Sequence, residues 1–140
     1  MREILFRGKT EDGKWVEGVF IPDCLESMKN QQVDGGFIKR YWLTGDHDKV
    51  QTETVEVVRE TVGQFTGLLD KNGKKIFEGD IVEIYWHNKK TMKAVVKFNE
   101  RLRGFWCYRS DIPTYSLGSW ASAELEVIGN IHDNPELMEV

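Results

Sequence analysis

Short runs of alternating apolar and polar residues occupy most of the chain, and this period of two is the pattern of β-strands. Polar or glycine-containing links separate the runs. One of them holds Asp12-Gly13, which supplies the positive-φ position that a hairpin turn needs. In the N-terminal half the pattern predicts strands over residues 2–8, 15–21, 33–43 and 51–60. The chain is therefore expected to be mainly β.

The N-terminal half departs from simple alternation in two places. Residues 15–21 carry apolar side chains on both faces, which indicates either a strand covered on both sides or a bulge at Gly18. Pro22 then ends the run, because proline has no backbone N–H to donate. The segment that follows, PDCLESMKNQQ, is the one helical turn predicted in this half, with Asp23 as its cap.

The C-terminal half is predicted to be a small barrel. Its glycines at 63, 67, 73 and 79 place a bend every four to six residues, and several short strands with curving glycines are typical of small closed barrels. The strand-like runs are joined by Asn88-Lys89-Lys90 and by residues 99–103. We expect an N-terminal β-lobe (1–60) with its helical turn, packed on a C-terminal lobe (61–140). The latter is an SH3-like barrel or a strongly coiled sheet, unless both lobes form one continuous domain.

The bulk properties indicate a cytoplasmic globular protein. With 140 residues, 40% of them hydrophobic, the chain can bury a real core. No run approaches the ~18 apolar residues that a membrane helix needs, and the N-terminus lacks the apolar stretch of a signal peptide. Cys24 and Cys107 lie far apart, with no CxxC motif and no neighbouring histidine, so both are interpreted as reduced thiols.

The charge is unevenly distributed although the net charge is only −4. Residues 71–103 contain nine Lys or Arg against four Asp or Glu, whereas residues 110–140 contain six acids and no Lys or Arg. The basic segment could bind an anionic ligand, meet the acidic segment of another copy, or be neutralised within one folded chain. The acidic pI of 5.4 favours the last reading.

The basic segment also contains the candidate nucleic-acid contacts. Binders of this kind combine cationic tracks for phosphates with aromatic faces for bases. On the run of residues 104–109, Phe105 and Cys107 face one way and Trp106 and Tyr108 the other, so one pair must be core. Trp106 and Tyr108 could then stack on bases or pack under the N-terminal lobe. Nucleic-acid binding is not favoured, because such domains usually have a pI above ~9. The candidates are Lys74, Lys75, Lys89, Lys90, Arg101, Arg103, Trp106 and Tyr108.

Other site chemistries are not supported. The stretch GLLDKNGKK has the wrong glycine spacing for a Walker A loop and lacks its Ser or Thr, so Asp70–Gly73 is interpreted as a type I turn with Gly last, or as part of an Asn-Gly hairpin turn. His47 lies between two aspartates, but one such triplet is not a metal-ligand set. No catalytic nucleophile motif is present. No cofactor, metal site or enzymatic activity is expected.

Three stretches resemble a known family. FRGK…DGKWVEGVFI, ETVGQFTGLLDKNGKKIFEGDIVEI and EVIGNIHDNPELM, in this order, are similar to the YopX-like family of phage and prophage proteins. Residues 60–84 and 126–137 carry the most specific similarity. The resemblance implies a small, mainly β protein encoded by phages or prophages, without an established activity and self-associating. It transfers no catalytic or binding residue.

Three functional hypotheses follow. The favoured one is a non-enzymatic phage accessory protein, a homo-oligomer that binds a phage or host protein. The alternative is a nucleic-acid-binding module that uses residues 71–103. An enzyme acting on a small ligand has no positive feature in the sequence.

Overall fold

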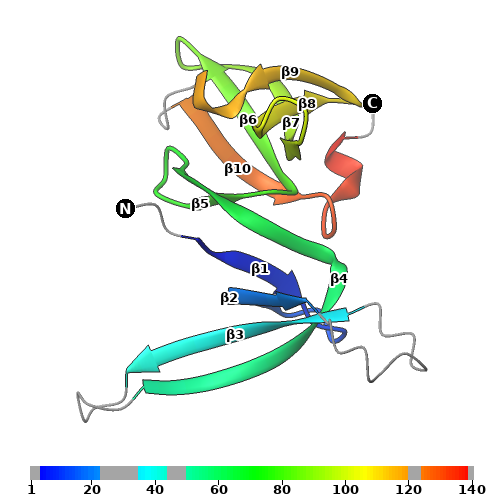
Figure 1. The fold of residues 1–140 in the computed structure, drawn as a ribbon. Helices are drawn as coiled ribbons and strands as arrows, with labels where there is room; N and C mark the ends of the chain where they lie inside the picture. The colour runs from blue at the N-terminus through cyan, green and yellow to red at the C-terminus, as the bar shows by residue number, and fades with distance from the viewer. Residues whose placement is uncertain (1–3, 23–34, 44–49, 120–123, 139–140) are drawn as a thin grey trace. The chain divides into compact units, whose positions relative to one another are not determined.

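The computed structural model describes residues 4–22, 35–43, 50–119 and 124–138 (Figure 1). The chain divides into two compact units, Met1–Gln64 and Phe65–Val140. All strand pairings in the described residues are antiparallel, and the fold is mainly β as the alternating pattern predicts. The predicted helical turn after Pro22 lies outside the described residues, as do Cys24 and His47.

The sheet of the N-terminal unit closes into a ring. It consists of β1 (Phe6–Lys9), β2 (Trp15–Pro22), β3 (Gly35–Leu43) and the first part of β4 (Val50–Leu69). These strands pair in that order, and β1 also pairs with β4, which closes the ring. The ring surrounds a small core of Val16, Ile38 and Val57.

The glycine in β2 is explained by close packing. A Cβ atom at Gly18 would lie 2.3 Å from the carbonyl oxygen of Lys39, so only glycine allows β3 to approach this closely. The pairings of β2 with β1 and β3 contain no register shift. Gly18 is therefore not a bulge, and the apolar residues on both faces of β2 are not caused by one.

The C-terminal unit is a curled five-stranded sheet with the order β10-β6-β7-β8-β9. Its strands and short 3₁₀ turns, η2 and η4, are drawn in Figure 1. Val82, Ile84, Ala94, Val96, Cys107 and Leu125 form its core together with Ile76 and Leu117. The elements are β5 (Lys75–Phe77), β6 (Asp80–Trp86), β7 (Lys89–Asn99), β8 (Gly104–Arg109), β9 (Ile112–Ser116), η2 (Leu117–Ser119), β10 (Leu125–Asn130) and η4 (Pro135–Met138).

The turn at Asp70–Gly73 is a type I turn with glycine in the last position. The N–H of Gly73 donates to the carbonyl oxygen of Asp70 at 3.0 Å, and Gly73 has φ +77°. Asn72 does not have the positive φ of an Asn-Gly hairpin turn. Of the two interpretations of this stretch, the type I turn is therefore confirmed.

The Asp70 carboxylate joins this turn to a distant strand. Its Oδ1 accepts hydrogen bonds from the N–H groups of Asn72 (2.8 Å) and Lys74 (2.9 Å), and its Oδ2 accepts one from Val127 (2.9 Å) on β10. Asp70 is only 4% exposed. Burial would raise the pKa of Asp70, but the three backbone hydrogen bonds outweigh it and lower the pKa below its usual value.

The prediction that Asn88-Lys89-Lys90 links two strands is wrong. The link is the two-residue turn His87-Asn88, whose φ angles of 49° and 62° are those of a type I′ turn. Histidine and asparagine tolerate positive φ better than most residues do, so this pair can replace a glycine turn. Lys89 and Lys90 therefore belong to β7, where they pair with Trp86 and Tyr85.

Asp70→Asn should lower the free energy of unfolding by about 1–3 kcal/mol, because an amide nitrogen would replace one carboxylate oxygen that accepts buried N–H groups. Since the folded-state pKa of Asp70 is lowered, its contribution is present above the unfolded pKa of about 3.9 and is lost as the pH falls through the folded value. Urea unfolding curves from neutral to acidic pH measure both effects. The difference between wild type and Asp70→Asn should shrink at the acidic end.

Asp12→Asn is the matched control, because Asp12 lies in the turn of another hairpin but is exposed to solvent. This variant should unfold close to wild type. Equal losses for the two variants would show that Asp70 does not hold the turn to β10.

Candidate functional site

The predicted basic residues do not form one patch. Lys89 and Lys90 begin β7, whereas Arg101 and Arg103 lie in the turn that follows its last residue, Asn99. The strand residues 91–99 lie between the two pairs and separate them by roughly 30 Å. Lys74 and Lys75 lie at a third place, the start of β5. All six residues lie in one segment of the sequence. In the structure, however, the length of β7 separates Lys89 and Lys90 from Arg101 and Arg103.

Most of these cations are available to another molecule. Lys74, Lys89, Lys90, Arg101 and Arg103 are exposed, and none of them forms an ion pair with any residue in the described ranges. Lys75 is half-buried. For these five residues, neutralisation by the acidic C-terminal segment within one chain is therefore not observed in the part of the chain that the structure describes.

The predicted aromatic residues are half-buried on β8. Phe105 and Cys107 are the pair that belongs to the core, so Trp106 and Tyr108 face outward. The Tyr108 hydroxyl accepts a hydrogen bond from Nδ2 of Asn99 at 2.8 Å, and Nζ of Lys97 lies 5.3 Å from the centre of its ring. Tyr108 already has contacts on its edge and its face, which leaves it poorly suited to stacking on a base.

The turn between β6 and β7 carries exposed aromatic residues that the sequence reasoning missed. Trp86 is 55% exposed, and the ring of His87 lies edge-on against it at 4.9 Å. Nζ of Lys71 lies 4.1 Å from the centre of the Tyr85 ring, a cation–π contact. The aromatic residues and the two lysines are close together in the sequence, but only the type I′ turn places Lys89 and Lys90 opposite Trp86 and Tyr85.

Carboxylates lie beside the same aromatic residues. The Tyr85 hydroxyl donates a 2.6 Å hydrogen bond to Oε2 of Glu126, and Glu83 pairs with Glu126 across the strands. This hydrogen bond, with burial and the two carboxylate charges, raises the pKa of Tyr85 to about 12. The Tyr85 face of the turn is thus of mixed charge, which is unfavourable for a phosphate backbone.

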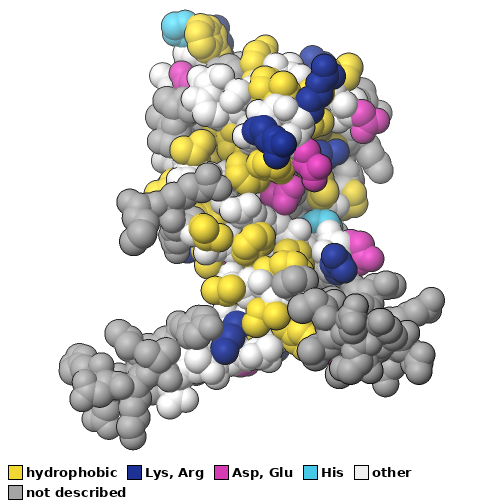
Figure 2. Space-filling model, viewed as in Figure 1, with side chains coloured by type: hydrophobic (Ala, Val, Ile, Leu, Met, Phe, Trp, Pro, Cys, Tyr) yellow, Lys and Arg dark blue, Asp and Glu magenta, His cyan; other side chains and the backbone are white. Residues whose placement is uncertain are grey.

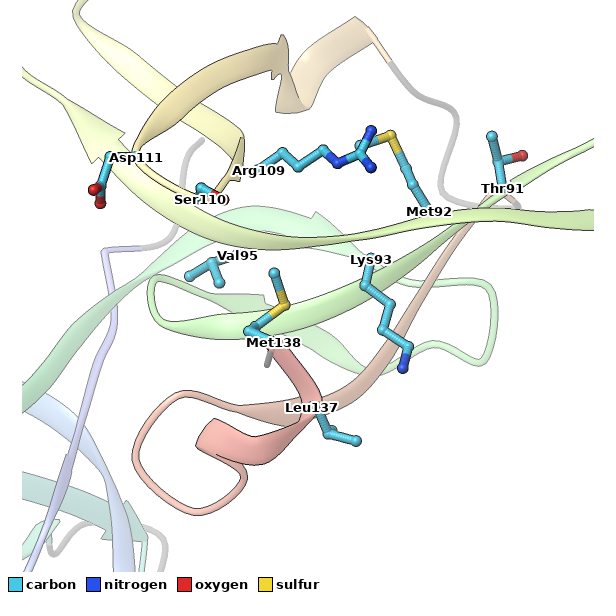
Figure 3. Close-up of a pocket in the computed structure, with 9 residues that line it drawn as sticks. All are labelled: Thr91, Met92, Lys93, Val95, Arg109, Ser110, Asp111, Leu137 and Met138. Carbon is cyan, nitrogen blue, oxygen red and sulfur yellow. The ribbon is translucent and has the colours of Figure 1, made fainter. Parts of the chain in front are cut away.

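A pocket of about 460 Å³ lies in the C-terminal unit between β7, the β8–β9 turn and η4 (Figure 3). Its apolar lining includes Val95, which is 6% exposed, and Met138, which reaches toward Val95 from η4. Charged and polar side chains complete the wall. The lining residues are Thr91, Met92, Lys93, Val95, Arg109, Ser110, Asp111, Leu137 and Met138.

Metal binding and thiol chemistry are two further candidate activities. In the described ranges, no three His, Cys, Asp or Glu side chains are grouped so that they could hold a metal ion. Cys107 is buried in the core, and burial raises the pKa of its thiol to about 12, so the thiol stays protonated and unreactive at neutral pH. In the same ranges, no helix is both long and apolar enough to cross a membrane.

These features define a class of protein: a small, mainly β protein of two units built on antiparallel strands, with exposed cations at the start of β7 and a pocket beside them. The chain belongs to the family described as YopX protein, whose family model matches residues 6–139. The predicted resemblance is confirmed. Among curated proteins, none matches this sequence.

A solved structure has the same fold. The crystal structure of protein EF1440 from Enterococcus faecalis matches with a TM-score of 0.60. The match covers 99% of this chain and 100% of that chain, at 23% sequence identity. At this identity the likeness establishes the fold alone.

Glu126→Gln should lower the pKa of Tyr85 from about 12 toward its ordinary value of about 10, because the variant removes the negative charge that holds the phenol neutral. Ultraviolet difference titration against Tyr85→Phe isolates the signal of this tyrosine. Glu124→Gln removes the same charge two residues away and should leave the titration unchanged. An unaltered Tyr85 pKa in Glu126→Gln would contradict the hydrogen bond.

Proposed function

We propose that this protein is a phage or prophage accessory protein that acts by binding another protein and by self-association, not by catalysis. The phage context rests on the resemblance to the YopX-like family. The observation that carries the proposal is the edge of the C-terminal sheet formed by β9. Figure 2 shows that hydrophobic side chains also reach the surface on the face drawn there, interspersed with Lys and Arg.

Strand β9 has the properties of an association surface. In the described part of the chain it pairs only with β8, so it is the last strand of its sheet. Ile112 on this strand is 67% exposed and Tyr115 is 40% exposed. An unpaired edge is a template for another strand, and association removes such apolar side chains from water.

The proposed contact is symmetric and depends on side chains. A two-fold dimer brings the same surface of both copies together, so one patch is sufficient. Pro113, the second residue of β9, has no N–H, which prevents a complete ladder between two β9 strands. Packing of Ile112 and Tyr115 must therefore supply much of the contact.

Ile112→Asp should lower the association constant at least about tenfold, because the dimer would bury a carboxylate without a partner. Light scattering across a concentration series measures the change, and circular dichroism verifies folding. Ile4→Asp is the matched control, since Ile4 is also 67% exposed but lies in the N-terminal unit. A wild-type protein that stays monomeric at high concentration would refute self-association, and equal effects of both variants would refute the role of β9.

Nucleic-acid binding is the second candidate, supported by the five exposed cations that lack an ion pair in the described ranges. Two observations weigh against it. Four of the cations lie in two pairs at opposite ends of β7 and Lys74 lies beside β5, and Glu83 and Glu126 lie beside the aromatic end. A ligand that used both ends would have to span roughly 30 Å, or about nine base pairs of duplex DNA.

If duplex DNA binds, log K should fall with log salt with a slope of about 0.9 for each phosphate contacted. Contacts at both ends through Lys89, Lys90, Arg101 and Arg103 predict a slope of about 3.6, and contacts at one end about 1.8. Fluorescence anisotropy with a labelled duplex gives this slope for wild type and for Lys89→Ala/Lys90→Ala. Absence of binding at low salt, or a flat salt response, would eliminate this candidate.

A further inference from the structure

We propose that the free edge of β7 and the adjoining pocket bind a short, extended, acidic and partly apolar segment of another protein. The inference rests on the proposed role in protein binding and names the surface and the chemistry of the partner. It uses a different strand from the self-association contact. Three features carry it: an unpaired strand edge, the pocket beside it and the charge of its rim.

The edge exists because β8 is shorter than β7. Strand β6 pairs with β7 from Lys89 to Val95, but β8 pairs only with Val95–Asn99. Strand β8 ends at Arg109, and the chain turns at Ser110 (φ 57°) into β9. Considering only described residues, Lys89–Ala94 therefore has a partner strand on one side. Such an edge can accept an extended peptide through main-chain hydrogen bonds.

The usable part of this edge is short. The register of β6 and β7 shifts between the pairs Tyr85–Lys90 and Ile84–Met92, which leaves Thr91 as a bulge. Beyond the bulge, Ala94 is completely buried, so regular pairing is available only at Met92 and Lys93. Two residues of ladder give little specificity, so side-chain contacts must select the ligand.

The pocket supplies the apolar contact. It opens beside this edge, since Thr91, Met92 and Lys93 line it together with the β8–β9 turn (Figure 3). Val95 and Met138 form an apolar surface inside it, and about 460 Å³ is within the size range of ligand pockets. An apolar side chain of a bound peptide can enter this space.

The rim supplies the charge. Lys89, Lys90, Lys93 and Arg109 are exposed, and none forms an ion pair with a described residue. Asp111 is the one carboxylate among the described residues that line the pocket. In Figure 3 the Arg109 side chain extends along the pocket toward Met92. Lys93 and Arg109 thus outnumber Asp111 in the lining. Lys89 and Lys90 add two cations along the edge, an excess that favours an acidic ligand and speeds its encounter with the protein.

A peptide fits these features better than a nucleic acid does. Phosphates require neither a main-chain edge nor an apolar pocket. Glu83, which pairs with Lys93 across the sheet, and Asp111 would both repel a continuous polyanion. A peptide, in contrast, is not charged at every residue, so it can place an apolar side chain beside Glu83 or Asp111 and its own acids elsewhere.

The test uses the full chain and a labelled hexapeptide, Glu-Val-Asp-Val-Glu-Leu, with fluorescence anisotropy at low salt. Two comparison peptides separate the contributions: Gln-Val-Asn-Val-Gln-Leu lacks the charge, and Glu-Ser-Asp-Ser-Glu-Ser lacks the apolar groups. We expect binding of the first peptide and weaker binding of both others. Failure of the first peptide to bind, or equal binding of the first and third, would overturn the inference.

Charge reversal locates the site. Lys93→Glu/Arg109→Glu should weaken binding at least about tenfold, since it replaces both rim attractions by repulsions. Arg101→Glu/Arg103→Glu changes the net charge equally at the other end of β7 and should have little effect. Equal losses from both double variants would indicate non-specific attraction and contradict the site.

Hydrogen exchange distinguishes the main-chain contact. The peptide should slow exchange of amides in residues 89–94, and unchanged exchange there would refute strand pairing. Single-stranded DNA that binds with the same dependence on Lys93 and Arg109 would reassign the surface to nucleic acid.

Light scattering on the same samples tests self-association separately. Loss of peptide binding with intact self-association rejects only this inference, whereas a monomer that binds the peptide rejects only the β9 contact.

Discussion

The buried carboxylate of Asp70 is the interaction on which the C-terminal unit depends. It accepts two N–H groups within its own turn and one from Val127, 57 residues later in the chain. A buried carboxylate is stable only when its oxygens are hydrogen-bonded, so the turn and β10 cannot separate without a large cost. The N–H of Lys71 also donates to the carbonyl oxygen of Leu125, which fixes the same two segments. As a result Lys71 lies over Tyr85.

Unequal strand lengths create the surfaces that the proposals use. Strand β7 has eleven residues and β8 has six, so one half of β7 has β8 beside it and the other half does not. The uncovered half carries lysines that form no ion pair with a described residue, and it borders the pocket. The same length separates the two basic pairs by roughly 30 Å, which opposes a single phosphate-binding track. The greater length of β7 relative to β8 thus favours a peptide ligand and disfavours a nucleic acid.

Local patterns predicted the fold well where short-range physics decides it. Turn chemistry predicted a turn at Asp70–Gly73, and alternation predicted that one of two pairs on residues 104–109 is core; the structure shows a type I turn and the core pair Phe105 and Cys107. The link after Trp86 was assigned wrongly, because two adjacent lysines resemble a polar loop. In the structure His87 and Asn88 adopt positive φ and complete the turn without glycine. The sequence did not indicate whether the candidate basic residues are exposed or paired; in the structure all of them except the half-buried Lys75 are exposed, and their grouping was not predictable from their order.

Neighbouring residues and ordered motifs were enough to predict the β class, the position of the turn at Asp70–Gly73 and the family. The grouping of the cations, the edge of β7 that has no partner strand among the described residues, the place of the pocket and the type of that turn emerge only from the folded chain. The first three depend on strand register and on where β8 ends, and both are set by contacts between residues far apart in the chain. Asp70 illustrates the difference: its turn is local, but its third hydrogen bond reaches β10.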